Sequence, residues 1–321
     1  MELSTFGRKR AQAEGVENVN ASGLARKLKK RIEGEVRFDD GSRALYATDG
    51  SNYRQVPIGV VLPKSAEDVE ETVALCREFG APILSRGGGT SLAGQCCNVA
   101  VVMDMSKYFN RILEINEAGK FARIQPGVVL DHLRERANEQ CGLTFGPDPS
   151  THNHCTLGGM VGNNSCGVHS VMTQFYGAGA RVSDNVEELE ILTYDGCRMR
   201  VGPTSDEELA QIISAGGRRG EIYAGLKRLR DVYADLIRAR YPDIPRRVSG
   251  YNLDDLLPEK GFHVARAVVG SESTLVTVLE AKLSLVKNPQ SRSLLLLWYP
   301  DVYSAGEHVM DILPFKPIGL E

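Results

Sequence analysis

The sequence lacks long apolar runs, a leader-like start and an excess of charge of one sign. No stretch of its 321 residues approaches the roughly 20 consecutive apolar residues of a membrane-spanning helix. Residues 1–6 contain no apolar signal core, so we expect a cytoplasmic location without a transmembrane segment. The net charge of −3 argues against a nucleic-acid partner, because such partners call for a strong basic field.

The sequence also lacks the cysteine spacings of disulfide frameworks and metal centres. Its cysteines are odd in number, and no Cys-x-x-Cys pair occurs: Cys76, Cys96, Cys97, Cys141, Cys155, Cys166 and Cys197. This pattern predicts reduced thiols and gives no zinc or iron–sulfur site. His152 and His154 form a His-x-His pair that a metal could use. We favour loop histidines that hydrogen bond the backbone, and we expect no metal site.

Hydrophobic residues make up 42% of the chain, enough for one large core or two smaller ones. Residues 1–50 are predicted to be an N-terminal arm. Within it, Leu24, Leu28 and Ile32 recur at helical spacing and predict a short basic amphipathic helix. We interpret its basic residues as a solvated face, with peripheral membrane association kept as the alternative.

A strand–helix–strand unit is predicted to follow the arm. Residues 56–63 form a short apolar run closed by proline, typical of a strand. Ser65 is a helix N-cap followed by acidic residues, and Gly80 ends that helix. Residues 82–85 predict a second buried strand that runs directly into Arg86 and three glycines. The predicted order is therefore strand, helix, strand, glycine loop.

The rest of the chain divides into further short elements. We expect strands at 99–104, 265–270 and 294–298, hairpins over 112–126 and 186–201, and helices at 129–141, 206–215, 222–239 and 304–312. The 140s to 170s are rich in Gly, Pro, Asn and Ser, and we expect an ordered binding loop there instead of a packed element.

The glycine loop (residues 86–91) carries the first chemical signal. Three consecutive glycines after a strand let backbone N–H groups converge on an anion, with no Cβ atoms in the way. Thr90 and Ser91 add hydroxyl donors, and Arg86 adds positive charge. The pattern indicates a phosphate or pyrophosphate site. It is neither Gly-x-Gly-x-x-Gly opening a helix nor a P-loop, and a flexible glycine turn is the alternative.

Two further segments of small residues support a ligand site. They are residues 146–150, Gly-Pro-Asp-Pro-Ser, and residues 156–167, Thr-Leu-Gly-Gly-Met-Val-Gly-Asn-Asn-Ser-Cys-Gly. A large flat ligand could lie against such a backbone and hydrogen bond its N–H and C=O groups. A long surface loop is the alternative for one such segment, but two of them in one domain favour a binding site.

In this order, the motifs resemble the FAD-linked oxidases of the vanillyl-alcohol oxidase/p-cresol methylhydroxylase type. Pro-Ile-Leu-Ser-Arg-Gly-Gly-Gly-Thr-Ser is followed by the two small-residue segments and then by Val-Gly-Ser-Glu-Ser-Thr at 269–274. The branch with D-lactate, glycolate and D-2-hydroxyglutarate dehydrogenases is most similar. Residues 183–189 and 249–253 resemble its large members, which carry a C-terminal iron–sulfur region. The resemblance covers about residues 45–290.

The resemblance implies an FAD site. Residues that it assigns to the cofactor are Arg86, Gly87, Gly88, Gly89, Thr90, Ser91, Gln95, Pro147, Asp148, Ser150, Gly158, Gly159, Gly162, Asn164, Gly167, Tyr176, Gly177 and Val278. The first seven would serve the pyrophosphate, and Val278 would meet the adenine end through its backbone. Relatives with covalent flavin carry histidine after the glycine turn, where this chain has Thr90, so we expect noncovalent FAD. Ser273 and Val276 replace two glycines of the family pattern at the adenine end.

The resemblance also implies a fold and a reaction. We expect an α+β fold in two lobes, a small βαβ lobe at about 51–115 and a larger, mainly antiparallel lobe at about 116–290. Residues 291–321 would begin a substrate-binding cap domain. In such enzymes a D-2-hydroxy acid gives a hydride to flavin N5, and electrons leave to a quinone, a flavoprotein or an iron–sulfur centre. The catalytic residues would lie beyond residue 321. An enolpyruvyl-sugar reductase and a noncatalytic FAD-binding remnant or subunit are the alternatives.

Overall fold

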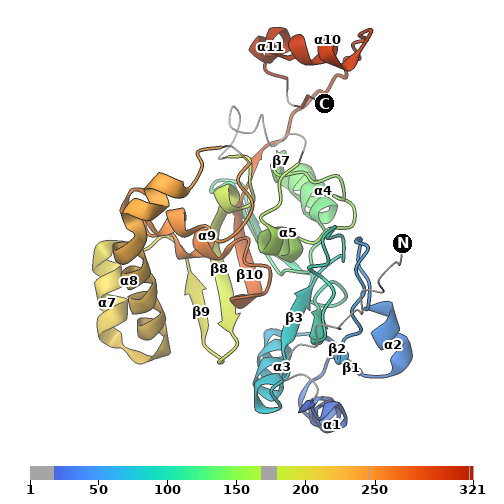
Figure 1. Ribbon diagram of the computed structural model, residues 1–321, viewed down its shortest axis with the longest axis vertical. Coiled ribbons are helices and arrows are strands. Elements are labelled where there is room, and N and C mark those ends of the chain that lie inside the picture. Colours follow the sequence, from blue (N-terminus) through green and yellow to red (C-terminus); the bar gives the residue numbers. More distant parts are fainter. Residues whose placement is uncertain (1–17, 168–178, 245, 318, 321) are drawn as a thin grey trace, which may run out of the picture.

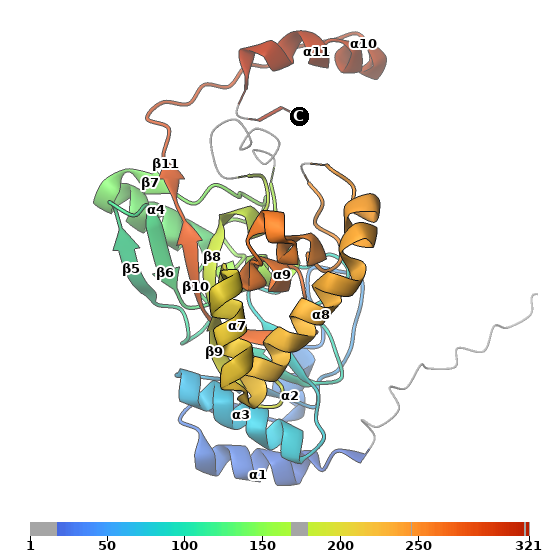
Figure 2. The same ribbon diagram turned by 90° about the vertical axis from the view of Figure 1, so that its left-hand side faces the viewer.

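The computed structural model of the chain describes residues 18–167, 179–244, 246–317 and 319–320. They form two α+β lobes that pack against each other, with a short helical segment standing apart at the C-terminal end (Figures 1 and 2). This arrangement confirms the expected fold class. No helix in the described part of the chain is long and apolar enough to cross a membrane.

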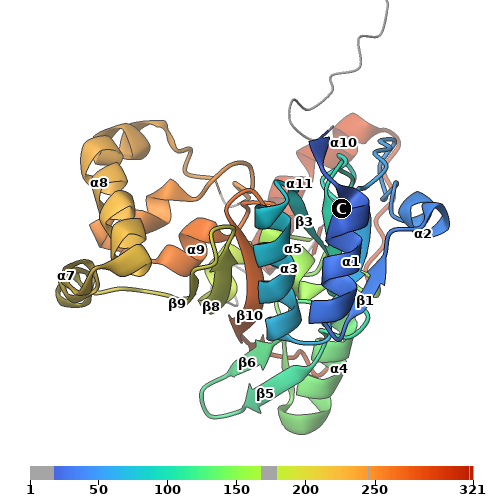
Figure 3. The same ribbon diagram turned by 90° about the horizontal axis from the view of Figure 1, so that it is seen from below.

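The first lobe is built on a four-stranded sheet in the order β1-β2-β4-β3. Its strands are β1 (Glu35–Arg37), β2 (Gly59–Leu62), β3 (Ile83–Arg86) and β4 (Val101–Asp104). Strand β1 runs antiparallel to β2, whereas the other neighbours are parallel. The lobe contains α1 (Ala21–Arg31), α2 (Asp40–Leu45) and α3 (Ala66–Glu78), and Figure 3 shows α1 beside α3.

The start of this lobe follows from local signals in the sequence. Ser65 Oγ accepts a hydrogen bond from Asp68 N at 3.2 Å and caps α3, as predicted. Gly80 takes a positive φ of 65° just after the helix, which a residue with a side chain adopts only at a cost. The strand–helix–strand unit therefore delivers Arg86 and the glycine loop to the carboxyl end of β3.

The structure places residues 21–37 inside the first lobe and not in a separate arm. Leu24 and Leu28 are fully buried in the lobe's core, and β1 pairs with β2. On the polar side of α1, Lys27 and Arg31 form ion pairs with α3, the latter at 2.9 Å from Glu71. The basic helix therefore uses one face for the core and part of the other for its neighbour.

The second lobe is built on a five-stranded antiparallel sheet in the order β5-β6-β10-β8-β9. Its strands are β5 (Ile112–Asn116), β6 (Phe121–Ile124), β8 (Val186–Thr193), β9 (Arg198–Val201) and β10 (Val276–Ser284). Both predicted hairpins, β5–β6 and β8–β9, are present. Strand β10 inserts between them and alternates strictly between buried and half-buried residues.

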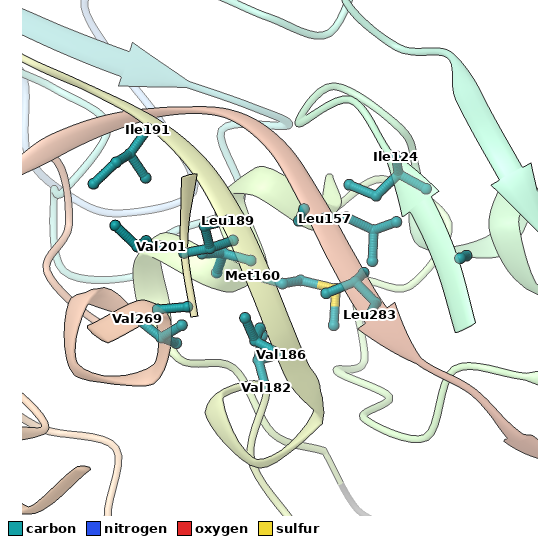
Figure 4. Packing of buried hydrophobic residues seen from close by; sticks show 14 of the residues in the cluster. Ile124, Leu157, Met160, Val182, Val186, Leu189, Ile191, Val201, Val269 and Leu283 are labelled. Atoms are coloured by element: carbon teal, nitrogen blue, oxygen red, sulfur yellow. The ribbon is translucent and has the colours of Figure 1, made fainter. Parts of the chain in front are cut away.

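Helices surround this sheet, and a small ribbon extends it. The helices are α4 (Leu130–Cys141), α5 (Leu157–Asn163), α7 (Asp206–Ala215), α8 (Gly217–Arg240) and α9 (Val264–Val268). The ribbon pairs β7 (Leu143–Thr144) with β11 (Val286–Lys287). Figure 4 shows the core from close by, with Leu157 and Met160 of α5 among Val186 and Leu189 of β8 and Leu283 of β10.

Two predictions fail inside the second lobe. Residues 157–163 form α5 and not a loop. Thr156 caps the helix, and Leu157, Met160 and Val161 are buried at helical spacing. Residues 265–270 were expected as a strand, yet Val264–Val268 is α9, capped by His263, whose ring accepts from Arg266 N at 3.3 Å. A short apolar run does not by itself distinguish a strand from a buried helix.

A third prediction fails near the C-terminal end. Residues 294–298 were expected to form a strand but have no strand partner within the described part of the chain. Trp298 is 90% exposed and Leu294 is 86% exposed. The following α10 (Val302–Glu307) and α11 (Val309–Ile312) match the expected helix and stand apart from the two lobes (Figure 2). The domain boundary near residue 290 stays a prediction.

Candidate cofactor site

A pocket with about 750 Å³ of empty space lies where the two lobes meet, and we call it the inter-lobe pocket. The glycine loop of the first lobe forms one wall, and α5 with the turn before β10 forms the other. Eight of the predicted cofactor residues line it: Arg86, Gly87, Ser91, Gln95, Gly158, Gly159, Gly162 and Val278.

The glycine loop touches the second lobe through glycines that leave no room for a side chain. A Cβ on Gly87 would lie 1.9 Å from Thr156 Oγ1, the atom that caps α5. A Cβ on Gly88 would lie 2.2 Å from the carbonyl oxygen of His154. Since real Cβ atoms do not approach other atoms this closely, these two positions require glycine. The two segments predicted as halves of one site are therefore in direct contact.

The backbone of the glycine loop presents a row of free donors. Among the described residues, the N–H groups of Gly87, Gly88, Gly89, Thr90 and Ser91 donate to no acceptor. Gly89 adds a positive φ of 67°, which helps turn the chain. None of these residues is buried, so water can satisfy the open N–H groups, and a run of such donors beside a pocket is able to bind a polyanion. A pyrophosphate fits this donor set.

The Arg86 side chain is used differently from our expectation. Its guanidinium donates to the carbonyl oxygens of Cys96 and Thr48, each at 2.9 Å, and lies 5.3 Å from the centre of the Tyr46 ring. These contacts tie the glycine loop to the segments around Thr48 and Cys96. Arg86 therefore holds the glycine loop in its conformation, and its positive charge lies in the wall of the pocket.

Helix α5 contributes a flat backbone surface to the pocket and few free donors. Leu157 N and Gly158 N are already bonded to the carbonyl oxygens of Val128 and Pro126, both at 2.8 Å. A Cβ on Gly158 would lie 2.4 Å from Pro126 Cβ, whereas a Cβ on Gly162 would meet nothing within 4 Å. The absence of side chains at Gly159 and Gly162 leaves an open face that suits a planar group.

The turn before β10 completes the pocket in a strained conformation. Thr274 N donates to Ser271 O at 2.9 Å, and the two central residues, Glu272 and Ser273, have φ values of 47° and 64°. Positive φ at both central residues is typical of a type I′ turn, which glycine and asparagine prefer. Each such residue costs about 1–2 kcal/mol. Ser273 therefore keeps a glycine-like backbone where the resembling family has glycine.

This turn is fixed to the end of α5. Gly270 N and Glu272 N donate to the carbonyl oxygens of Val161 and Gly162 at 2.9 and 3.1 Å. Gln95, which comes from the first lobe, lines the pocket together with Glu272. Burial raises the pKa of Glu272 above its usual value.

The other predicted residues do not line the inter-lobe pocket. Gly88, Gly89 and Thr90 belong to the glycine loop but are not part of the pocket's lining, and the remaining ones lie outside it: Pro147, Asp148, Ser150, Asn164 and Gly167. Tyr176 and Gly177 fall outside the described residues.

Those outlying residues still form one connected region. A Cβ on Gly167 would lie 1.9 Å from the carbonyl oxygen of Asp148, so the two small-residue segments touch there as well. Arg134 donates to the carbonyl oxygens of Phe145, Gly146 and Pro147 at 3.1 to 3.4 Å, and burial lowers the pKa of its guanidinium. This arginine holds the 145–147 backbone in place.

Sequence reasoning missed several pocket residues. Ser85, Met105, Pro126, Thr156 and Glu272 all line the pocket. Thr156 carried a usable signal, since a threonine before an apolar residue is a common N-cap. Pro126 and Met105 carried none, because only the packing of the two lobes brings them to the pocket.

The two histidines of the His-x-His pair have separate partners. His152 Nδ1 lies 2.7 Å from Asp131 Oδ2, and His154 Nδ1 lies 2.7 Å from Asn153 Oδ1. Across the described residues, no cluster of three or more His, Cys, Asp or Glu could hold a metal ion.

Comparison with known proteins agrees with this site. The profile of the FAD binding domain matches residues 57–202. The chain is 33% identical over 294 residues to a D-2-hydroxyglutarate dehydrogenase of Pseudomonas putida, covering 90% of this chain and 28% of that protein. It is 30% identical over 293 residues to the glycolate oxidase subunit GlcD of Bacillus subtilis, covering 90% of this chain and 50% of that protein. The chain thus spans half or less of the length of these relatives.

Solved structures support the fold. Alkyldihydroxyacetonephosphate synthase matches with a TM-score of 0.57 at 21% identity, over 90% of this chain and 47% of that one. The open donors of the glycine loop, the pocket between two lobes and the matched profile agree on one cofactor, FAD. The chain belongs to the FAD-linked oxidase family and carries its p-cresol methylhydroxylase-type FAD-binding domain.

Proposed function

We propose that this chain is the FAD-binding part of a dehydrogenase that oxidises a D-2-hydroxy acid of the lactate, glycolate or 2-hydroxyglutarate type. The observation that carries the proposal is the row of open N–H donors from Gly87 to Ser91, at the edge of a pocket closed by α5. Two relatives that match over 90% of this chain are named for 2-hydroxy acids. The bound flavin would accept the hydride of the substrate Cα at N5.

The residues of this chain would hold and orient the cofactor. The glycine loop would bind the pyrophosphate through its backbone, and Gly159 and Gly162 would let a planar group lie against α5. Thr90 stands where covalent relatives carry histidine, so the flavin would be held without a covalent bond. Val278 would meet the adenine through its backbone, and Pro147, Asp148 and Gly167 would extend the site toward the isoalloxazine.

The setting of the reaction is also proposed. We expect a cytoplasmic protein whose flavin passes electrons to a quinone, another flavoprotein or an iron–sulfur centre. Residues 291–321 would begin the substrate-binding cap. Because the described residues contain no metal-binding cluster and the pocket wall offers no histidine, we expect the substrate-activating groups to come from that cap.

Anaerobic mixing with candidate reductants tests this function. The 321-residue chain loaded with FAD should have its flavin reduced by D-2-hydroxyglutarate, D-lactate or glycolate only slowly or not at all, and NADPH should leave it oxidised. Dithionite, a non-enzymatic reductant, should bleach it fully and shows that the flavin is competent. The measurement is the loss of the flavin absorption band in a stopped-flow spectrometer.

Three outcomes would redirect the proposal. Rapid bleaching by NADPH would indicate a reductase of the enolpyruvyl-sugar type. Robust turnover of a D-2-hydroxy acid by the 321-residue chain would contradict the expectation that further residues complete the site. Extending the chain through a downstream cap without any gain in substrate reduction would favour a noncatalytic FAD-binding subunit.

A further inference from the structure

We propose that the outward face of α8 binds the α8 of a second copy of this chain, with the two helices antiparallel around a two-fold axis. Four apolar side chains form this face, which we call the α8 stripe: Leu229, Val232, Tyr233 and Leu236. Leu229 is half-buried and joins the stripe to the core of the second lobe. The stripe lies outside the inter-lobe pocket, so the inference does not rest on FAD binding.

Helix α8 has two apolar sides, and its own lobe covers only one of them. Tyr223 and Ile237 are buried on the inner side. On another side of the helix, Val232 is 65% exposed, Leu236 53% and Tyr233 50%. Figure 2 looks onto α8 from outside, with no other element in front of it. The α8 stripe therefore has no partner among the described residues.

The spacing of the stripe is that of a helix that packs against another helix. Its members recur at i, i+3, i+4 and i+7, so they follow one face over two turns. Apolar residues that are exposed one by one are normal on a protein surface, whereas a contiguous exposed stripe marks an interaction site. The apolar run at 294–298 is assigned above to the start of the cap, but no role described so far uses this side of α8.

The charges beside the stripe identify the partner as a second α8. Arg228 and Asp235 are seven residues apart, so they lie on the same edge of the stripe, two turns from each other. Among the described residues, Arg228 forms no ion pair, and Asp235 has only an exposed contact with Arg238 at 3.1 Å. In an antiparallel copy, Arg228 of each chain faces Asp235 of the other. A parallel copy would place like charges together instead.

The same two-fold axis also brings the apolar side chains together. Val232 lies midway between Arg228 and Asp235, so the axis passes beside it and Leu229 of each copy packs against Val232 of the other. A single pair of helices buries less than the roughly 1,200–2,000 Å² of a standard protein interface. The association should therefore be weak, with a dissociation constant of roughly micromolar size or above.

Sedimentation velocity of the full chain over a range of concentrations tests the interface. The unmodified chain should pass from the mass of one chain to the mass of two as its concentration rises to about 100 μM. Val232→Glu places two carboxylates, one from each copy, beside the axis and should weaken the association at least tenfold or so. Leu236→Glu should act in the same direction.

Exchanging the charges tests the antiparallel orientation. Arg228→Glu and Asp235→Arg should each weaken the association several-fold, because each variant places like charges opposite each other at two points of the dimer. The double variant should bring the dissociation constant back to within about threefold of the original, because opposite charges face each other again. A double variant that stays as weak as the single ones would contradict the antiparallel pairing.

Leu295→Glu is the matched control. It introduces the same charge at an apolar residue that is 76% exposed and lies outside α8, so it should leave the association unchanged. Circular dichroism checks that every variant is folded, and FAD binding should be the same in all of them. A chain that stays monomeric at every concentration would overturn the inference. So would a dimer that Leu295→Glu abolishes and Val232→Glu preserves.

Discussion

Gly88→Ala is expected to lower FAD affinity by about 100-fold or more, equivalent to roughly 3 kcal/mol. The added Cβ would lie 2.2 Å from the carbonyl oxygen of His154 and 3.0 Å from its carbonyl carbon. Both atoms belong to backbone that cannot rotate away, so the glycine loop and the 151–155 segment must separate. That movement displaces the row of N–H groups that we propose to bind the pyrophosphate.

Fluorescence titration of the cofactor-free protein with FAD measures this effect. The matched control is Gly225→Ala in the middle of α8, where a Cβ would meet nothing within 4 Å. This change should leave FAD affinity unaltered and stabilise the protein by up to about 1 kcal/mol, because alanine favours a helix over glycine. Circular dichroism checks that both variants fold. If the Gly88→Ala variant is folded and its FAD affinity stays close to that of the original protein, the role of the loop is refuted.

His263 and Asp255 are expected to make opposite contributions to the pH dependence of the unfolding free energy. In the unmodified protein these two contributions largely cancel. Both side chains are 6% exposed, and His263 N donates to Asp255 O at 2.7 Å. Burial, reinforced by Arg266, lowers the pKa of His263 from 6.5 to about 4. Burial, reinforced by the neighbouring Asp254, raises the pKa of Asp255 from 3.8 to about 6.

The signs follow from proton binding in the two states. Between pH 6.5 and 4, His263 takes up a proton in the unfolded chain but stays neutral in the folded protein. Acidification therefore destabilises the folded protein through His263. In the same interval Asp255 takes up a proton in the folded protein while it stays charged in the unfolded chain. Acidification therefore stabilises the folded protein through Asp255. Each contribution changes by about 2–3 kcal/mol across the interval.

Single variants should reveal each contribution. Relative to the unmodified protein, His263→Asn should gain about 2 kcal/mol of unfolding free energy on going from pH 6.5 to 4, and Asp255→Asn should lose about as much. Urea unfolding at both pH values measures this, and His132→Asn, on the exposed side of α4, is the control. If the unfolding free energies of both variants change between pH 6.5 and 4 by the same amount as that of the unmodified protein, His263 and Asp255 do not have the pKa shifts stated above.

Much of the fold could be predicted because its signals are local. Ser65 as a cap, Gly80 as a stop and the turn within the 186–201 hairpin each act within a few residues, and the structure has all of them. The glycine loop was equally predictable, since three consecutive glycines after a strand are typical of a backbone that binds an anion. These elements account for the strand–helix–strand unit, both hairpins and one half of the pocket.

The rest depended on contacts between residues far apart in the chain. Leu157 lies in a short glycine-rich helix whose apolar residues join the core beside β8 and β10 (Figure 4), and such a helix depends on tertiary packing more than on its own propensity. The short run at 264–268 became a helix through the ring of His263, which no pattern of hydrophobic residues predicts. Glu272 was part of a recognised motif, but its place in the pocket follows from the turn geometry and from the hydrogen bond of its N–H to Gly162 O.

The central claim is that this chain holds FAD between its two lobes, and the absorption spectrum of the purified protein tests it most directly. We predict the two bands of an oxidised flavin, with about one FAD per chain. Acid precipitation should release the flavin into the supernatant as intact FAD, because no covalent bond holds it. A colourless protein that stays empty after incubation with FAD would contradict the account.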